Sequence, residues 1–326
     1  MFRKHSGRKS ANPIFILFRF ILSLIIFTIL LGGVYSAYKH FSGLDPLKLD
    51  PKSVANEALT LLSKVKIGDQ KLLPQNLTAS TPVPKTSPKS VFKFLLVADS
   101  HSDNNNLQKA ISQAKQIFPD IQFVIGLGDY TEVGTLDEMQ KAKKEFDEAN
   151  LRYFLIPGDH DLWDSRDKNQ PPLTNFRQIF GPTYQSFSLH NFKFILLDNS
   201  DNYLGIDEVQ LKWVAGELER SKDEQVKAIF VFVHEPLFHP SSDHIMGRVE
   251  KELKNQARSL IFALVGVKKV FAGDTHYFSQ YNEPETNLSM VTIGAVGTER
   301  NPQLPRFAVV TVFEDGSTMV DDVEIK

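Results

Sequence analysis

Acidic and histidine residues follow five short apolar segments, each with the length and composition of a buried strand. Carboxylates and imidazoles are the side chains that bind divalent metal ions where no thiolate is available, and the chain contains no cysteine. One such residue after a strand is often only a helix N-cap, but five successive occurrences favour a shared site. The segments are Asp99-Ser100-His101, Gly128-Asp129, Gly158-Asp159-His160-Asp161, His234-Glu235 and Gly273-Asp274-Thr275-His276.

The spacing within two of these segments predicts that paired side chains share one ion. Asp99 and His101 are separated by one residue, as are Asp274 and His276. If such a pair continues a strand, both of its side chains point to the same side. Because ligand sites of open α/β folds form at the carboxyl ends of parallel strands, the sequence predicts a divalent metal site at that edge.

A body of alternating strands and helices is expected to position these residues. Short apolar strands that alternate with helices predict an α/β sheet buried on both faces, and the later strands predict a second sheet, with helices outside. The expected strands are Val91–Ala98, Phe123–Leu127, Tyr153–Ile156, Ser186–Leu189, Phe192–Leu197, Ile229–Val233, Val270–Ala272, Met290–Ile293, Phe307–Phe313 and Thr318–Val323; the expected helices are Leu107–Phe118, Leu136–Ala149 and Val209–Leu218.

The order of the motifs resembles that of calcineurin-like metallophosphoesterases over about residues 91–323. The family pattern runs Asp-x-His, Gly-Asp, Gly-Asn-His-Asp or Glu, a strand-end His, and Gly-His-x-His. Phe180–Tyr184 and Gln210–Trp213 also resemble segments of extracellular phosphatases of that family. The resemblance implies a four-layer α/β/β/α sandwich, in which helices flank two packed mixed sheets. It also implies two divalent metal ions at the strand ends, with Mn, Fe, Zn, Mg and Ca all open as their identity.

The resemblance further implies a reaction and a role for each matching residue. A hydroxide activated by the two metals would attack a phosphomonoester or phosphodiester of a small substrate or nucleotide, and His160 would protonate the leaving group. The implied metal ligands are Asp99, His101 and His276 on the first ion, Asp129 between both ions, and Asp159, His234 and Asp274 on the second.

Two of these residues depart from the family pattern. Asp159 stands where the family usually has Asn, and Asp274 where it usually has His. Four carboxylates would then face two divalent ions, and the additional oxygen ligands shift the preference of the second site toward harder ions than Zn²⁺. Either this site is retuned, or it is degenerate and the protein is a weak enzyme or a metal-binding scaffold of the envelope.

Other polar residues near the motifs have two interpretations each. Asp161 and Asp103 would orient His160 or a ligand imidazole, or would serve as turn and capping residues. His239 and His244 would contact substrate, although solvated loop positions are the more ordinary interpretation. Trp163 would stack on a base or sugar, or pack within the fold.

The N-terminus has the pattern of a membrane anchor. No charged residue occurs from Phe20 to Tyr38, and the apolar stretch begins at Ile14 with only Arg19 inside it. About 20 apolar residues span a bilayer as a helix, and the basic cluster before Pro13 predicts that this end stays in the cytoplasm. A cleavable signal peptide that ends near Ser36 is the alternative, and it would release a secreted protein.

The remaining chain is predicted to lie outside the cytoplasm as a stalk and one domain. We expect a basic tail at residues 1–13, a transmembrane signal-anchor at 14–38, a stalk with a Pro-rich linker at 39–90, and the metallophosphoesterase domain at 91–326. Removing the six basic residues that precede Asp45 from the net charge of −2 leaves −8 for the rest. Such an acidic body argues against broad binding to nucleic acids.

Overall fold

The computed structural model describes residues 88–326 apart from residue 225. The described residues belong to one compact unit. The predicted basic tail, membrane anchor and most of the predicted stalk lie outside them, so these remain predictions. Within the described part of the chain, no helix combines the length and the apolar character needed to cross a membrane.

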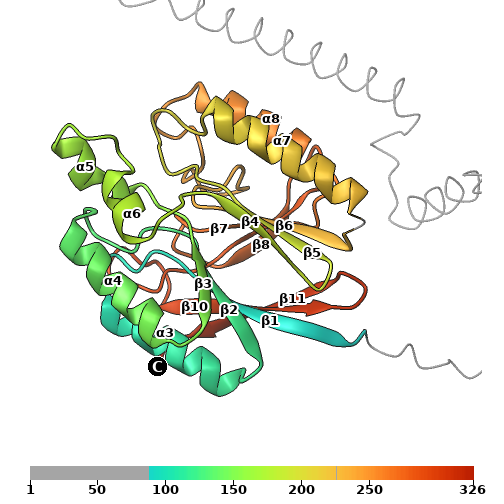
Figure 1. The fold of residues 1–326 in the computed structure, drawn as a ribbon, viewed down its shortest axis with the longest axis horizontal. Helices are drawn as coiled ribbons and strands as arrows, with labels where there is room; N and C mark the ends of the chain where they lie inside the picture. Colours follow the sequence, from blue (N-terminus) through green and yellow to red (C-terminus); the bar gives the residue numbers. More distant parts are fainter. Residues whose placement is uncertain (1–87, 225) are drawn as a thin grey trace, which may run out of the picture. The chain divides into compact units, whose positions relative to one another are not determined.

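Two mixed β-sheets form the centre of the fold (Figure 1). The first has the strand order β11-β10-β1-β2-β3, and the second has the order β4-β5-β6-β7-β9-β8. In the first sheet β1, β2 and β3 run parallel, whereas β10 pairs antiparallel with β1 and β11. In the second, β5, β6, β7 and β9 run parallel between the antiparallel edge strands β4 and β8.

The bounds of every strand except β8, for which no strand was predicted, match the apolar segments of the sequence to within one or two residues. The first sheet comprises β1 (Ser90–Val97), β2 (Ile121–Gly126), β3 (Arg152–Leu155), β10 (Arg306–Phe313) and β11 (Thr318–Glu324). The second comprises β4 (Gln185–Leu189), β5 (Phe192–Leu196), β6 (Ala228–Val233), β7 (Lys269–Ala272), β8 (Ser279–Asn282) and β9 (Ser289–Thr292).

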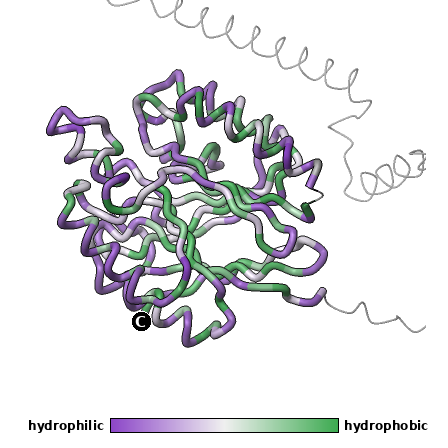
Figure 2. The backbone as a smooth tube through the Cα atoms, viewed as in Figure 1, coloured by the Kyte–Doolittle hydropathy of each residue, from purple (hydrophilic) through white to green (hydrophobic). Residues whose placement is uncertain are grey.

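Alternate residues of each central strand enter two different cores. In β1, Phe94 and Leu96 pack between the sheets, whereas Leu95 and Val97 pack under the helices. The inter-sheet core is rich in phenylalanine, and the Phe94 and Phe123 rings stack with their centroids 5.2 Å apart. Both faces of these strands are therefore buried, which explains why the segments read as continuous apolar runs (Figure 2).

Helices cover the outer face of each sheet and complete four layers (Figure 1). Helices α3 (Asn104–Ile117) and α4 (Leu136–Glu148) pack on the first sheet. Helices α7 (Glu208–Asp223) and α8 (Leu253–Ala263) pack on the second. The starts of three of them are set by side-chain caps: Asp103 for α3, Asp207 for α7, and Thr135, which forms a capping box with Glu138, for α4.

The prediction of two sheets with outer helices is confirmed, but several elements were missed. No structure was predicted for α8, for strand β8, or for the short helices η1 (His160–Leu162), α5 (Trp163–Asp167) and α6 (Thr174–Ile179). Helix α3 also begins three residues earlier than Leu107, because Asp103 accepts a hydrogen bond from the Asn106 backbone N–H. These short helices follow β3, next to the site described below.

Candidate metal centre

The sequence-predicted residues come together where strands of both sheets end. Asp99, Asp129 and Asp159 follow β1, β2 and β3 of the first sheet, whereas His234 and Asp274 follow β6 and β7 of the second. Four sets of potential ligand atoms lie within 4.8 Å of one another: Asp99, His101 and His276; His101, Asp129 and His160; Asp99, Asp129 and His234; and Asp159, His234 and Asp274. The first and last sets match the two predicted ligand groups, and Asp129 belongs to both sets between them.

A left-handed backbone conformation, rather than an extended strand, aims these side chains. Asp99 and His101 have φ values of 54° and 43°, and Asp274 and His276 have φ values of 60° and 59°. The expectation that each pair continues a strand is therefore wrong, although each pair still converges. Seven of the twelve non-glycine residues with positive φ in the described chain lie at this site, including Asp129 at 54°. Such clusters of strained backbone occur at functional sites.

Two glycines allow the loops to approach this closely. A Cβ on Gly158 would lie 2.1 Å from Oδ1 of Asp129 and 2.4 Å from its backbone nitrogen. A Cβ on Gly128 would lie 2.6 Å from both the Gly158 nitrogen and Nδ1 of His234, and Gly128 has a φ of 96°. Any side chain at these positions would separate the loops that carry the carboxylates.

Hydrogen bonds to backbone carbonyls orient the imidazoles toward the centre. Nδ1 of His234 lies 2.7 Å from the Leu127 carbonyl, and Nδ1 of His276 lies 3.0 Å from the Arg300 carbonyl. These bonds place a proton on Nδ1 and turn Nε2 inward, as in metal-binding histidines. The inward Nε2 atoms of His101 and His276 are 3.1 Å apart.

The buried polar atoms fit divalent cations. Oδ2 of Asp99, Nε2 of His234 and Oδ2 of Asp274 are buried without a hydrogen-bond partner. Burial raises the pKa of Asp99, and it raises that of Asp129 well above its usual value. Unpaired buried carboxylates are costly, and a bound divalent ion removes that cost. The donor set of oxygens and imidazole nitrogens is also one that such ions prefer.

Charge also favours a cation beside His234. Nε2 of His234 lies 3.6 Å from an oxygen of Asp129 and 3.6 Å from one of Asp159. Burial opposes a charge on His234, but Asp129 and its neighbours raise the pKa of His234 well above its usual value. Burial likewise opposes ionisation of Asp159, yet His234 lowers the pKa of Asp159 to about 2.

Asp161 holds the loops in place and does not orient an imidazole. Its carboxylate accepts hydrogen bonds from the backbone N–H groups of Asp129, Tyr130 and Thr131 at 3.0 to 3.1 Å and from that of Gly158 at 2.9 Å. The Thr131 hydroxyl adds a fifth bond of 2.7 Å. Burial nevertheless raises the pKa of Asp161 to about 6. Asp103 caps α3, as its turn-and-cap interpretation predicted.

His160 occupies a distinct position at the edge of the cluster. Its Nδ1 lies 2.7 Å from the Glu132 carbonyl, so Nδ1 donates and Nε2 is the reactive end. Nη1 of Arg300 lies 3.1 Å from that Nε2, and the second Arg300 nitrogen pairs with the Glu132 carboxylate. Trp163 stacks on the His160 ring with the centroids 3.9 Å apart and also lines the cavity described next, so it packs on His160 and still faces the space for a substrate.

A cavity of about 560 Å³ opens onto these residues. Some of the residues that line it were not predicted from the sequence or were interpreted differently. Arg248 and Arg300 were not predicted, because no local pattern marks either residue. His244 also lines the cavity, and its Nδ1 lies 3.6 Å from Oδ1 of Asp274. His239, by contrast, is buried and bonded to Ser279, so its interpretation as a solvated residue is wrong.

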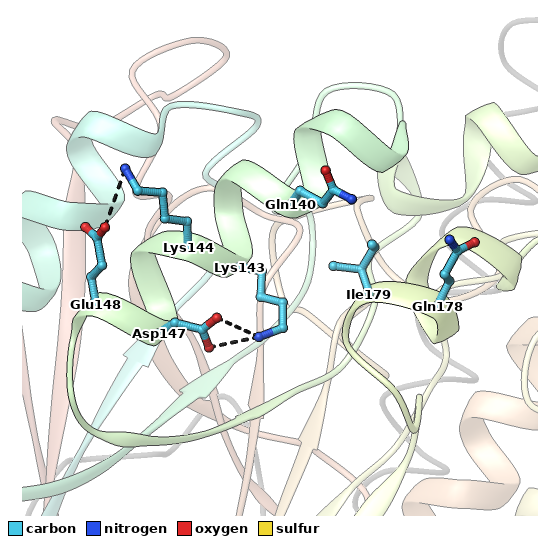
Figure 3. Close-up of a pocket in the computed structure, with 7 residues that line it drawn as sticks. All are labelled: Gln140, Lys143, Lys144, Asp147, Glu148, Gln178 and Ile179. Atoms are coloured by element: carbon cyan, nitrogen blue, oxygen red, sulfur yellow. Dashed lines mark hydrogen bonds and ion pairs between the residues drawn. The ribbon is translucent and has the colours of Figure 1, made fainter.

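A second hollow of about 580 Å³ lies between α4 and α6, away from the strand ends (Figure 3). Its charged residues pair along their own helix: Lys143 with Asp147 at 2.7 Å and Lys144 with Glu148 at 3.5 Å. Such exposed pairs at i,i+4 spacing are ordinary on helix surfaces. This hollow therefore offers no chemistry comparable to that of the strand-end cavity.

A family model for calcineurin-like phosphoesterases matches residues 92–278, which is more than half of the chain. The chain belongs to the calcineurin-like phosphoesterase family. The family match covers all seven predicted ligands and His160, since all of them lie between residues 92 and 278.

Named relatives and solved structures agree with this family. The chain is 25% identical to rat "Serine/threonine-protein phosphatase CPPED1" over 224 residues, which is 63% of this chain and 69% of the relative. It is 25% identical to "Probable glycerophosphodiester phosphodiesterase GpdQ" of Arcobacter nitrofigilis over 144 residues, or 43% and 50% of the two chains. A dimetal phosphatase from Danio rerio shares the fold, with a TM-score of 0.55 at 18% identity over 73% of this chain and all of that one.

Proposed function

We propose that this calcineurin-like phosphoesterase is a membrane-anchored, extracytoplasmic enzyme that hydrolyses phosphomonoesters or phosphodiesters with two divalent metal ions. One observation carries the proposal. Buried carboxylates and inward-facing imidazole nitrogens converge in two sets, and Asp129 lies close to members of both. Several ligand atoms of these sets are buried without a hydrogen-bond partner. The site faces a cavity large enough for a small substrate.

The proposed division of the ligands follows the two sets. Asp99, His101 and His276 would hold one ion. Asp159, His234 and Asp274 would hold the other, with Asp129 between them. Ions bound there would lower the pKa of water to near neutrality and neutralise phosphoryl oxygens.

The side chains around the site have proposed tasks that their contacts support. His160 would donate a proton from Nε2 to the departing alkoxide, because its Nδ1 is fixed by the Glu132 carbonyl. Asp129 accepts a hydrogen bond of 3.0 Å from the His160 backbone N–H, which ties the acid to the central carboxylate. Asn202 donates to Oδ2 of Asp159 at 3.1 Å and would orient that carboxylate.

The second ion site is proposed to favour Mn²⁺, Mg²⁺ or Ca²⁺ over Zn²⁺. In the ligand set found among the described residues, His234 supplies one imidazole, and Asp159 and Asp274 supply oxygen atoms in place of the amide and imidazole usual in the family. Harder ions prefer such oxygen-rich sites. Asp274→His should therefore move the metal preference toward Zn²⁺, as measured by elemental analysis after competition between the two metals.

The proposed location rests on the sequence alone. The basic leader and the uncharged run Phe20–Tyr38 support a signal-anchor with the catalytic domain outside the cytoplasm. Protease added to spheroplasts should remove the domain. A domain that stays protected would contradict this location, and one released without protease would support the cleaved signal peptide instead.

Hydrolysis by the metal-loaded chain tests the proposed activity. The full-length protein would be stripped with a chelator, loaded with each metal, and assayed on 4-nitrophenyl phosphate and on bis(4-nitrophenyl) phosphate, with Asp129→Ala as the inactive reference. If the wild type hydrolyses neither ester but Asp159→Asn with Asp274→His creates activity, the protein is the scaffold descendant that its two aspartates also allow.

A further inference from the structure

The metal centre of this chain has little positive charge with which to attract a phosphate. Four carboxylates surround the proposed position of two divalent ions: those of Asp99, Asp129, Asp159 and Asp274. The four negative charges of these carboxylates equal the four positive charges of the two ions, so the formal charge of the centre is zero. A site of this kind needs another source of positive charge to bind an anionic substrate.

The cavity wall carries two arginines whose charges are unequally compensated. Arg300 pairs with the Glu132 carboxylate, which partly compensates its charge. Arg248 contacts the His244 ring at 3.1 Å and, within residues 88–326, makes no ion pair with a carboxylate. Of the two arginines in the described cavity wall, Arg248 is therefore the one without a carboxylate partner, which leaves its guanidinium available to an incoming anion.

Arg248 also stands next to the position at which the chain departs from its family. Its partner His244 lies 3.6 Å from Oδ1 of Asp274, so one chain of contacts joins Arg248 to the second ligand set. Arg248 lines the metal-centre cavity and also an adjoining cavity of about 370 Å³ that contains Trp163 and Tyr203. A guanidinium that lines both cavities faces the space in which a substrate at the metal centre would lie.

We propose that Arg248 binds the phosphoryl group of the substrate and makes the enzyme selective for phosphomonoester dianions over phosphodiester monoanions. The proposal rests on the proposed phosphoesterase function. A planar guanidinium binds two phosphoryl oxygens at once, and a monoester offers more unesterified oxygens and one more negative charge than a diester. Arg248 thus supplies the attraction that Asp159 and Asp274 remove from the metal centre.

Paired substitutions in the full-length chain test this role. Arg248→Gln should raise KM for 4-nitrophenyl phosphate and the inhibition constant of inorganic phosphate by about 10- to 100-fold, the range expected when a charged hydrogen bond is lost. The loss for bis(4-nitrophenyl) phosphate should be smaller, so the monoester-to-diester ratio of kcat/KM should fall. Arg248→Lys should recover part of the phosphate affinity. Arg258→Gln is the matched control, because Arg258 pairs with Glu285 on the surface of the molecule.

A charge-restoring variant separates attraction from shape. Asp274→His removes one negative charge from the second ligand set, so in the Arg248→Gln background it should recover part of the affinity for inorganic phosphate. Unchanged phosphate inhibition and an unchanged substrate ratio in Arg248→Gln, at wild-type metal content, would overturn the proposal. A wild type that hydrolyses neither ester would overturn the proposed function instead. Calorimetric binding of inorganic phosphate to the metal-loaded variants would then still decide the role of Arg248.

Discussion

Gly158 is the position at which a single added carbon should remove the metal centre without unfolding the protein. In Gly158→Ala the new Cβ would lie 2.1 Å from Oδ1 of Asp129 and 2.4 Å from its backbone nitrogen. Real Cβ atoms essentially never approach a neighbour closer than 3.0 Å, so Asp129 and Gly158 must separate by close to 1 Å. Because the nitrogen belongs to the backbone, rotation of the Asp129 side chain cannot relieve the contact.

This displacement exceeds what a metal centre tolerates. Constellations of ligands must be held within about 0.5 Å, and a misplacement of 1 Å can lower a rate by about 10²-fold. We expect Gly158→Ala to lose at least one equivalent of metal in elemental analysis and to lower hydrolysis of 4-nitrophenyl phosphate by about 10²-fold or more. The circular dichroism spectrum should stay that of the wild type, because the core between the sheets is untouched.

Gly216→Ala provides the matched control. Gly216 lies within α7, and the atom nearest to its added Cβ is the mobile end of Arg220 at 3.4 Å. Replacing a helical glycine by alanine should stabilise the protein by about 1 kcal/mol and leave metal content and activity unchanged. If Gly158→Ala instead binds two ions per chain and retains the wild-type rate, the close approach of these loops does not set the position of Asp129, and our account of the site is wrong.

Three further predictions concern individual groups. His160→Gln should lower turnover by about 10²- to 10⁴-fold at unchanged metal content, with the smallest loss for a nitrophenolate leaving group, which needs little protonation; equal losses for nitrophenyl and alkyl phosphates would contradict the acid role. Binding of Mn²⁺ at neutral pH should release protons, because burial raises the pKa of Asp129 and the neighbouring carboxylates raise that of His234 in the metal-free protein. The metal-free protein should therefore lose stability as the pH rises past the ordinary carboxyl range, and the gain in Tm on adding metal should grow with pH. Calorimetry of Mn²⁺ binding in buffers of different ionisation enthalpy should count the released protons, and a binding enthalpy that is the same in every buffer would refute this. Asp161→Asn should cost about 2 to 3 kcal/mol of stability in denaturant titration, because an amide cannot accept all five of the hydrogen bonds that this carboxylate accepts; a loss below about 1 kcal/mol would show that the loops keep their positions without Asp161.

The sequence predicted the strand-end residues because their signal is local. Asp99, Asp129 and His234 each follow an apolar run that is buried on both faces, and such runs can be recognised in the sequence alone. The alternation of strands and helices likewise predicted the two-sheet arrangement. The backbone turns that bring the side chains together could not be predicted, because Asp and His tolerate a left-handed φ and nothing in the sequence marks Asp99 and His101 as residues that adopt it.

The contacts that the sequence missed connect distant segments. Arg300 meets His160 across 140 positions of the chain, and nothing in the Thr-Glu-Arg-Asn segment around it indicates that partner. Helix α8 was a different kind of omission, because its buried Leu253, Ala257, Leu260 and Ile261 do follow a helical period. Strand β8 is short and polar, and it forms only because its partner β9 offers an open edge.

A metal titration of hydrolysis tests the central claim most directly. Metal-free, full-length protein at a concentration far above the dissociation constants would receive Mn²⁺ in steps, with hydrolysis of 4-nitrophenyl phosphate followed at each step. We expect activity to appear mainly with the second equivalent and to reach a plateau at two ions per chain, because both ligand sets must be filled. A plateau at one equivalent, or hydrolysis that continues without metal, would contradict a dinuclear phosphoesterase site at these strand ends.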